Sequence, residues 1–334
     1  MKLKFAMIGC RGHSGSYVFR GIQNGAAVDL TAICGGGDDP AGLKNAAEKY
    51  GFKPSVYDDW EKMLAEVKPD LVCVDGPFEL HAKMAAAALQ NGCHVFCEKP
   101  ISLTLEDLDR LEAAWRKSGK HIRSMVGLRY HPAFLHAFRL VQAGTIGKIK
   151  LIRTQKSYKL GQRQDFYKKR ATYGGTIPWV GSHAVDWILY YTGGQFEQVT
   201  AYHDPADNFG YGELEIAGHC LFRMSGGIIA DAGVDFLRPS TAPTHGDDRV
   251  RIAGTCGVLE VMEGKVHVID QEGDRFITPP APDRDLFSDF TIELTAGRRA
   301  LVSDEGTVAL TRAVLLARES ADTGKTLFFN GDQA

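Results

Sequence analysis

Short apolar segments alternate with segments of helical composition over the first 130 residues. The predicted strands are residues 5–9, 28–34, 70–75, 94–96 and 122–128, and the predicted helices are residues 41–50, 79–90 and 105–117. Thr104, with Asp107 three residues on, resembles a capping box and marks the start of the last of these helices. Strands that alternate with helices predict a parallel sheet covered by helices, so we expect the first half to be an α/β domain.

The pattern changes after about residue 148, where long β-rich segments follow one another with turn residues between them. The predicted strands are residues 150–159, 199–203, 213–222 and 227–236, and the predicted helices are residues 183–191 and 307–323. Consecutive strands of this kind predict a large open, mostly antiparallel sheet. We therefore expect two domains, residues 1–125 and residues 126–334, with the closing helix able to pack back towards the first domain.

The composition is that of an ordinary globular protein and argues against some classes of binding partner. Of 334 residues, 44% are hydrophobic and 24% are charged, and the net charge is only −2. This balance gives no reason to expect nucleic acid as a partner. The apolar stretches are far shorter than the roughly 18 residues that span a bilayer, and we see no signal peptide, so we expect neither a membrane protein nor an exported one.

Seven cysteines are scattered along the chain without a Cys-x-x-Cys pair. An odd number in a chain of this length predicts free thiols and a reducing cytoplasm rather than a disulfide framework. Cys93 and Cys97 are four residues apart, but they flank the strand at 94–96, and core thiols are a better interpretation than metal ligands. We expect no metal site.

A glycine turn joins the first strand to the helix that should follow it. The segment Gly-Cys-Arg-Gly-His-Ser-Gly at 9–15 is one residue longer than the usual dinucleotide fingerprint, and a purely structural turn fits the same spacing. Its place at the first β–α junction favours a pyrophosphate site, because glycines admit the phosphates and the helix start offers N–H groups. The expected cofactor contacts here are Gly9, Arg11, Gly12, His13, Ser14 and Gly15.

The end of the second strand should carry an acidic residue that binds the adenosine ribose. Here the strand ends in three glycines that begin at Gly35, and Asp38 and Asp39 come slightly late. Either the glycine run folds back and brings Gly35 and Asp38 to the ribose, or the two aspartates form a solvated turn. No arginine follows the strand to bind a 2′-phosphate, which favours NAD over NADP, while Arg11 keeps NADP open.

Several further motifs occur in one order along nearly the whole chain. They are Pro77 and His81, Glu98-Lys99-Pro100 after the strand at 94–96, residues 126–132 and 144–147 at the crossing into the second half, Gly174-Gly175 before His183 and Asp186, and residues 320–324. Because these motifs recur in the right order, the chain strongly resembles the glucose-fructose oxidoreductase and inositol dehydrogenase (Gfo/Idh/MocA) family.

The resemblance implies NAD or NADP on an N-terminal Rossmann domain, and an open sheet in the second domain for substrate and oligomer contacts. Sugars, inositols and related polyols are typical substrates of that family, and a homodimer or homotetramer is the implied assembly. The implied cofactor contacts are Pro77, His81, Glu98 and Lys99, and the substrate candidates by family position are Arg129, Tyr130 and His245.

Lys99 is, by this resemblance, the lysine that lies between nicotinamide and substrate. An ammonium group beside the reacting hydroxyl lowers the pKa of that hydroxyl and stabilises the alkoxide as hydride leaves. Arg170 belongs to a basic and aromatic segment at 156–170 that could meet an acidic sugar or lactone, although a solvated loop explains the segment as well.

His183 matches the family's proton-transferring histidine. Trp179, Asp186 and Tyr190 lie three or four residues apart on its helical face, which makes Trp179, His183 and Asp186 substrate candidates. Where the family commonly has aspartate, this chain has Trp179, and an indole cannot accept a proton. Trp179 either stacks on a sugar ring and reshapes the pocket, or marks a loss of catalysis.

The sequence therefore predicts an NAD(P)-dependent oxidoreductase that moves hydride between nicotinamide and a secondary alcohol or ketone of a sugar, inositol or related polyol. Lys99 and His183 are the expected catalytic residues. Two alternatives stay open. One is a dinucleotide-binding sensor or regulatory protein without turnover, and the other is an enzyme with tightly held NAD that performs net lyase or glycosidase chemistry through transient oxidation.

Overall fold

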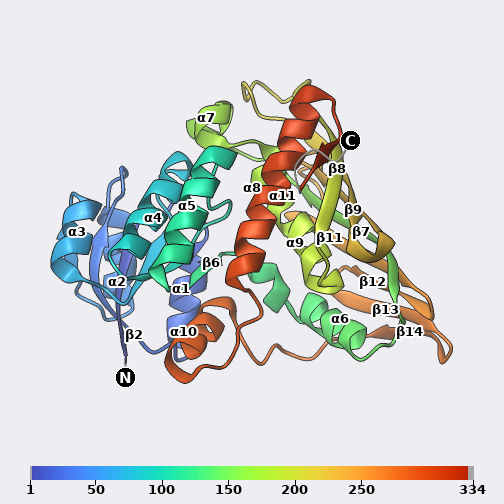
Figure 1. The fold of residues 1–334 in the computed structure, drawn as a ribbon, viewed down its shortest axis with the longest axis horizontal. Coiled ribbons are helices and arrows are strands. Elements are labelled where there is room, and N and C mark those ends of the chain that lie inside the picture. Colours follow the sequence, from blue (N-terminus) through green and yellow to red (C-terminus); the bar gives the residue numbers. More distant parts are fainter. Residues whose placement is uncertain (1, 330–334) are drawn as a thin grey trace. The chain divides into compact units, whose positions relative to one another are not determined.

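The computed structural model describes residues 2–329, and their internal contacts divide the chain into two compact units (Figure 1). Unit 1 contains the residues up to Gly127 together with Arg284–Thr311, and unit 2 contains Leu128–Asp283 with the residues from Arg312 onward. The segment Arg284–Thr311 is thus grouped with the N-terminal unit, whereas the sequence placed it in the second domain. Helix α11 (Asp304–Thr323) begins in unit 1 and ends in unit 2.

Unit 1 is built on a six-stranded sheet with the order β3-β2-β1-β4-β5-β6, in which every neighbouring pair is parallel. Its strands are β1 (Leu3–Ile8), β2 (Val28–Cys34), β3 (Ser55–Tyr57), β4 (Leu71–Val74), β5 (His94–Cys97) and β6 (Ile122–Ser124). The strand order reverses between β1 and β4, and ligands of such sheets bind beyond the carboxyl ends of the strands at that point. The predicted Rossmann-type sheet is confirmed.

Helices cover this sheet, and three of the elements of unit 1 went unpredicted. The helices are α1 (Ser14–Gln23), α2 (Ala41–Lys49), α3 (Trp60–Val67), α4 (His81–Gln90), α5 (Leu105–Ser118) and α10 (Leu286–Ala296), with a 3₁₀ turn at Phe78–Leu80. The predicted cap of α5 is present, because Thr104 Oγ1 accepts the Asp107 N–H at 3.1 Å. Strand β3 and helices α3 and α10 were missed. Strand β3 has only three residues, and its first two are exposed. The strand expected at 122–128 ends at Ser124.

The segment that returns to unit 1 late in the chain packs against the core of this sheet. Phe287 of α10 lies 5.4 Å from the ring of Phe5 and 5.2 Å from the ring of Phe96. A Cβ on Gly21 of α1 would come within 2.8 Å of Phe287, so a glycine is needed for α1 and α10 to approach this closely. The core of unit 1 therefore requires a residue that lies after β14 in the sequence, far from Phe5 of β1 and Phe96 of β5.

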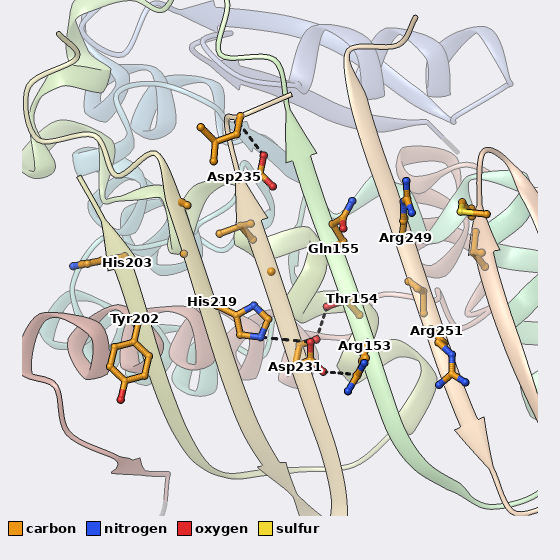
Figure 2. Close-up of a pocket in the computed structure, with 18 of the residues that line it drawn as sticks. Arg153, Thr154, Gln155, Tyr202, His203, His219, Asp231, Asp235, Arg249 and Arg251 are labelled. Carbon is orange, nitrogen blue, oxygen red and sulfur yellow. Dashed lines mark hydrogen bonds and ion pairs between the residues drawn. The ribbon is translucent and has the colours of Figure 1, made fainter. Parts of the chain in front are cut away.

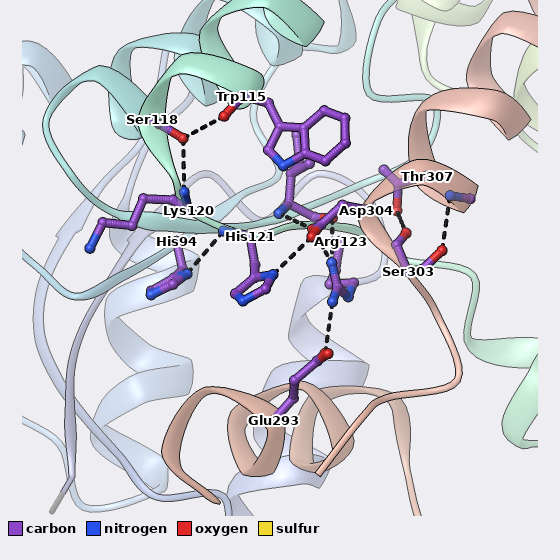
Figure 3. A network of polar contacts seen from close by, with 12 residues as sticks. His94, Trp115, Ser118, Lys120, His121, Arg123, Glu293, Ser303, Asp304 and Thr307 are labelled. Carbon is purple, nitrogen blue, oxygen red and sulfur yellow. Dashed lines mark hydrogen bonds and ion pairs between the residues drawn. The ribbon is translucent and has the colours of Figure 1, made fainter. Parts of the chain in front are cut away.

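A buried polar network fastens the start of α11 to strand β6 (Figure 3). Asp304 accepts the Ile122 N–H at 2.6 Å, contacts His121 Nδ1 at 2.8 Å and pairs with Arg123. Arg123 also donates to Glu293 of α10 at 2.7 Å. Carboxylates near the first turn of a helix are favoured by its dipole, and here Asp304 also neutralises a buried arginine.

Unit 2 is built on a nine-stranded sheet with the order β14-β13-β12-β11-β7-β10-β9-β8-β15. Its strands are β7 (Ile149–Tyr158), β8 (Phe196–Asp204), β9 (Ala217–Met224), β10 (Ile228–Asp235), β11 (Gly246–Gly254), β12 (Gly257–Met262), β13 (Lys265–Asp270), β14 (Gly273–Ile277) and β15 (Leu327–Phe328). Among the described strand pairs, the pair formed by β7 with β10 is parallel and all the other pairs are antiparallel. The mostly antiparallel sheet is therefore confirmed, although the strand expected at 213–222 begins at Ala217.

Helices cover one face of this second sheet. They are α6 (Pro132–Gln142), α7 (Arg170–Tyr173), α8 (Thr176–Trp179) and α9 (Gly181–Thr192), with 3₁₀ turns at Gly127–Tyr130, Asp165–Lys168 and Ser225–Gly227. Helix α9 packs on β7 and β10, and α6 packs on β12 and β13 (Figure 1). Alternate residues of the strands are buried on this covered face, which is the period of two that a sheet with one covered face requires.

The opposite face of the nine-stranded sheet carries exposed apolar side chains among charged ones. Those with more than two-fifths of their surface exposed are Tyr202, Leu221, Ile229, Met262, Ile269 and Phe276. The face also contains a hollow of about 760 Å³, in which His219 and Arg153 reach towards Asp231 (Figure 2). Within the described residues, no helix is both long enough and apolar enough to cross a membrane.

Candidate cofactor and substrate sites

The glycine turn at 9–15 lies at the carboxyl end of β1, between β1 and α1. Gly9 has φ +77°, and a Cβ there would lie 2.5 Å from the Asp75 carbonyl oxygen. A Cβ on Gly12 would lie 2.6 Å from Glu98 Oε2. Both positions therefore need glycine because other backbone or side-chain atoms approach them closely. The turn sits at the point of the sheet where a dinucleotide pyrophosphate is expected.

The first N–H groups of α1 meet two carboxylates from neighbouring strands. Asp75, directly after β4, accepts the Gly12 N–H at 2.7 Å and the Ser14 N–H at 3.0 Å. Glu98, directly after β5, accepts the His13 N–H at 2.6 Å and contacts His13 Nδ1 at 2.9 Å. Both carboxylates are fully buried. The turn is thus shaped to receive anionic oxygen atoms, which is the property that a pyrophosphate site needs.

The two carboxylates have opposite electrostatic environments. Burial first, and then the negative charge of Glu98, raises the pKa of Asp75 to about 8. Burial also acts to raise the pKa of Glu98, but the His13 side chain, its N–H group and Lys99 together lower it. These surroundings therefore favour a proton on Asp75 over one on Glu98.

The glycine run after β2 folds back, as one of the two sequence interpretations required. A Cβ on Gly35 would lie 1.7 Å from the Asp38 carbonyl oxygen, so the chain turns tightly at that point. Asp38 thereby reaches the first glycine turn, where it accepts hydrogen bonds from Arg11 Nε at 3.0 Å and Nη2 at 2.6 Å. Asp39 instead accepts the Ala41 N–H at 2.9 Å at the start of α2. Of the two aspartates, Asp38 has the position suited to a ribose contact.

The loops after β4 and β5 are tied together by His81. Its Nε2 contacts the Gly76 carbonyl at 3.1 Å, and its Nδ1 contacts the Pro100 carbonyl at 3.0 Å. Burial lowers the pKa of His81, although the contacts with the two carbonyl groups act to raise it. Pro77 precedes this helix and lies 3.3 Å from a Cβ built on Gly37. These contacts connect three of the loops at the carboxyl edge of the sheet.

Lys99 lies at this same edge, directly after β5. Its backbone N–H donates to Glu98 Oε1 at 2.8 Å, its side chain is buried, and the Lys99–Pro100 peptide bond is cis. The sequence-predicted cofactor residues of unit 1 therefore come together at the carboxyl ends of β1, β2, β4 and β5. Asp75 was not predicted, although an acidic residue that ends a buried apolar strand was a signal for it.

In unit 2, His183 lies in the first turn of α9 and is buried, with 3% of its surface exposed. The glycines before it adopt positive φ angles, +85° at Gly174 and +105° at Gly175. Buried Glu215 accepts the Thr176 N–H at 2.9 Å and so holds the start of α8. Trp179 ends α8 and meets the Tyr167 ring edge-on at 6.3 Å between centroids. The glycine lead-in thus positions both Trp179 and His183.

Two further substrate candidates of unit 2 contact residues of that unit. Arg170 pairs with Glu215 and with Asp322, the latter at 3.1 Å. His245 stacks on Tyr158 at 4.9 Å between ring centroids. Burial first, then the positive charges of Arg163, Lys156 and Lys159, lowers the pKa of His245.

The fold brings Arg129 and Asp186 together as a hydrogen-bonded pair. Tyr130, the residue after Arg129, is also buried. A buried pair that sequence reasoning missed is Lys156 with Asp248, whose Nζ and Oδ2 lie 2.5 Å apart. Asp248 stands directly opposite Lys156 across β7 and β11, so the missed signal was a cross-strand register that only the folded sheet defines.

Comparisons with known proteins agree with the fold of both units. The model of the oxidoreductase family with an NAD-binding Rossmann fold matches residues 3–127, and the model of the GFO/IDH/MocA C-terminal domain matches residues 134–260. The chain belongs to the GFO/IDH/MocA family of oxidoreductases. Its N-terminal unit is the family's NAD-binding Rossmann domain, and either NAD or NADP is consistent with this domain as the cofactor.

Individual relatives are similar to this chain to different extents. A Thermotoga maritima structure, named only as an oxidoreductase, is 41% identical and covers 98% of this chain and 100% of that one, with a TM-score of 0.91. Inositol 2-dehydrogenase of Salmonella typhimurium is 31% identical over 151 residues, 44% of each chain, so the match spans less than half of that curated relative. Levoglucosan dehydrogenase, solved with NADH and levoglucosan, shares the fold at 18% identity, with a TM-score of 0.84 over 99% of this chain and 100% of that one.

Proposed function

We propose that this protein transfers hydride between NAD(H) and a secondary alcohol, or the corresponding ketone, of a sugar, inositol or related polyol. The observation that carries the proposal is the convergence of the glycine turn, Asp38 and Glu98-Lys99-Pro100 at one edge of the parallel sheet. Family membership supports it, as do relatives whose names specify inositol and levoglucosan as substrates.

The proposed cofactor contacts are those that the sequence predicted in unit 1. They are Gly9, Arg11, Gly12, His13, Ser14, Gly15, Gly35, Asp38, Pro77, His81, Glu98 and Lys99. A bound nicotinamide supplies the hydride acceptor for alcohol oxidation, or the donor for ketone reduction. Asp38 supports NAD over NADP, because a carboxylate at the end of β2 can accept from the ribose hydroxyls and would repel a 2′-phosphate.

Lys99 and His183 have separate roles in the proposed chemistry. When the substrate C–H bond gives up hydride, the O–H bond gives up a proton and the carbon–oxygen bond becomes a carbonyl. His183 accepts that proton, since an imidazole is suited to proton transfer near neutral pH. The ammonium of Lys99 stabilises the alkoxide character that develops on the same oxygen. Ketone reduction uses the same residues with the proton moving in the opposite direction.

The substrate contacts that we propose beyond Lys99 and His183 are chiefly aromatic. Trp179 offers an indole face on which a sugar ring can stack, and its neighbour Tyr167 adds a second aromatic surface. Arg129, Tyr130, Asp186, Arg170 and His245 were also predicted as substrate contacts. The ion pairs of Arg129, Asp186 and Arg170 support a role in holding the protein framework of the site.

We also propose a homo-oligomer in which the uncovered face of the nine-stranded sheet meets a second copy of the chain. Exposed Leu221 and Ile229 lie on the neighbouring strands β9 and β10 of this face, and apolar surface of this kind favours association. The face also carries Arg251 and Asp231, so it can complement itself across a two-fold axis. All seven cysteines carry free thiols, which supports a reducing cytoplasm as the location.

A panel of sugars, inositols and other polyols, screened with NAD⁺ and with NADP⁺ at the absorbance of the reduced nicotinamide, tests the proposed function. Net formation of NADH with at least one member is the expected result. Cofactor binding without turnover of any polyol or ketone would instead favour a sensor. Product formation without net NADH would favour transient oxidation, because the nicotinamide is then restored in each cycle.

A further inference from the structure

The N–H groups that open α1 already have anionic partners inside the protein. Asp75 receives the N–H groups of Gly12 and Ser14 through its two oxygens, at 2.7 and 3.0 Å, and Glu98 receives that of His13 at 2.6 Å. Neither carboxylate has any exposed surface. The proposed hydride transfer uses neither of them to move a proton on the substrate, so their presence at this turn needs another explanation.

Those N–H groups are also the donors that a helix start of this kind offers to a pyrophosphate. A pyrophosphate brings negative charge to the place where Asp75 and Glu98 are buried. Low-dielectric surroundings strengthen repulsion between like charges, so two ionised carboxylates would oppose the cofactor strongly. Cofactor binding therefore requires that at least one carboxylate lose its charge.

We propose that Asp75 sets the affinity for the dinucleotide, because binding at the glycine turn requires the Asp75–Glu98 pair to hold a proton taken from solvent. This proposal rests on the proposed use of the turn by NAD(H). A proton on one Asp75 oxygen removes the opposing charge and lets that carboxyl release an N–H group of Gly12 or Ser14. The protonated carboxyl can also donate its O–H to a phosphate oxygen, which an ionised carboxylate cannot do.

The surroundings of the pair select Asp75 as the group that takes the proton. Glu98 accepts from His13 and Lys99 and is stabilised as an anion, whereas Asp75 is buried beside that anion. The titratable or charged groups that face the pair are Cys10, His13 and Tyr17 from the turn and α1, Cys73 from β4, His81 from α4, and Cys97 and Lys99 from the end of β5. Because a thiol can also titrate at alkaline pH, the test needs a control for Cys10.

The proposal predicts a direction for the pH dependence of cofactor binding. Since the pKa of Asp75 is raised to about 8, the pair already holds its proton well below pH 8, and affinity should be constant there. Above pH 8 the free protein loses that proton, so binding must recover it, and the dissociation constant should rise by up to about tenfold per pH unit. Each NADH bound at pH 9 should then take up close to one proton.

NADH titrations by nicotinamide fluorescence between pH 6.5 and 9.5 test this with wild type, Asp75→Ala and Cys10→Ser. Wild type and Cys10→Ser should share the same loss of affinity above pH 8. Asp75→Ala should show a flat profile and bind NADH at least about tenfold more tightly than wild type at pH 9.5. Calorimetry of the wild type at pH 9, in two buffers of different ionisation enthalpy, should report the proton uptake directly.

A flat wild-type profile without proton uptake would overturn the proposal, and so would Asp75→Ala with the wild-type pH slope. If Asp75→Ala does not fold, the buffer dependence of the wild-type enthalpy decides the question alone. If NADH binds neither wild type nor Asp75→Ala at any pH, the cofactor assignment itself is contradicted, and with it the proposed function. Tight but pH-independent binding would contradict only the role of Asp75.

Discussion

Arg129 and Asp186 form a two-point ion pair inside unit 2, with Nε donating to Oδ2 at 2.8 Å and Nη2 donating to Oδ1 at 2.6 Å. Both side chains are buried, and the guanidinium lies 4.9 Å from the ring centre of Tyr190. The sequence predicted each residue as a substrate contact, but the geometry gives the two charges to each other. Because Asp186 is on α9, the pair fastens the helix that carries His183.

Removal of one partner of this pair should destabilise unit 2. Asp186→Ala leaves the Arg129 cation buried without its carboxylate, which typically costs about 3–5 kcal/mol. The urea midpoint should therefore fall markedly. The matched control is Asp165→Ala, because Asp165 forms an exposed ion pair with Lys168, and such pairs contribute little. An unchanged midpoint for Asp186→Ala would show that the pair does not support the fold.

Lys99 and His183 should each control turnover rather than substrate affinity. Lys99→Met removes the cation that stabilises the alkoxide, and His183→Ala removes the proton acceptor, so each should lower kcat by about 10²- to 10⁴-fold with an active polyol. Lys83→Met changes an exposed lysine and should retain wild-type kinetics. Steady-state rates with saturating cofactor measure the effect. Wild-type kcat and an unchanged pH profile in His183→Ala would move the proton acceptor to another residue.

Trp179 should act mainly on substrate binding. Its indole is buried beside Tyr167 and has no acceptor atom, so it can contribute stacking but cannot move a proton. We expect Trp179→Ala to raise KM about tenfold with a smaller change in kcat, and Trp179→Phe to restore most of the affinity. A loss of kcat that Trp179→Phe does not restore would argue that the indole does more than stack.

His94 should make the protein less stable in mild acid. Burial first, and then the charges of Lys120 and His121, lowers the pKa of His94 to about 4, below the value of about 6.5 in an unfolded chain. The unfolded state therefore binds more protons between these values, and stability is lost as pH falls from about 6.5 towards 4.

Urea midpoints of wild type and His94→Gln at pH 7.5 and pH 5 check this expectation. The glutamine can still accept the His121 N–H, which His94 Nδ1 accepts at 3.0 Å. The variant should lose less stability than wild type between the two pH values. His136→Gln, in which a less buried histidine is changed, should behave almost as wild type does. Equal acid losses in wild type and His94→Gln would contradict the assignment.

The uncovered sheet face should determine the assembly state. Leu221→Glu with Ile229→Glu places two carboxylates among apolar side chains that are about half exposed, 51% and 54%. If this face binds a second copy, the double variant should have a smaller mass by light scattering at micromolar concentration, with its circular dichroism unchanged. Lys53→Glu, a change in unit 1, serves as the control. A monomeric wild type would contradict the proposed interface.

Elements with local signals could be predicted from the sequence alone. Alternating apolar runs and helical segments specified β1, β2, β4 and β5, because a strand buried on both faces must be apolar throughout. The cap at Thr104 was readable because it joins residues three apart. The glycine spacing predicted a cofactor site at the carboxyl edge of the parallel sheet. The Glu98-Lys99-Pro100 motif, with the other motifs, predicted the family. Short or half-exposed elements such as β3 gave no comparable signal.

Which side chains meet could be learned only from the folded chain, because those contacts join residues that are distant in sequence. Phe287 completes the core of unit 1 from a segment that follows strand β14 of the second sheet, and no local pattern records that return. Arg129 and Asp186 looked like two ligand contacts until the fold placed their charges together. Asp75 meets the glycine turn at 9–15 because β4 lies beside β1, which brings its carboxylate to the first N–H groups of α1.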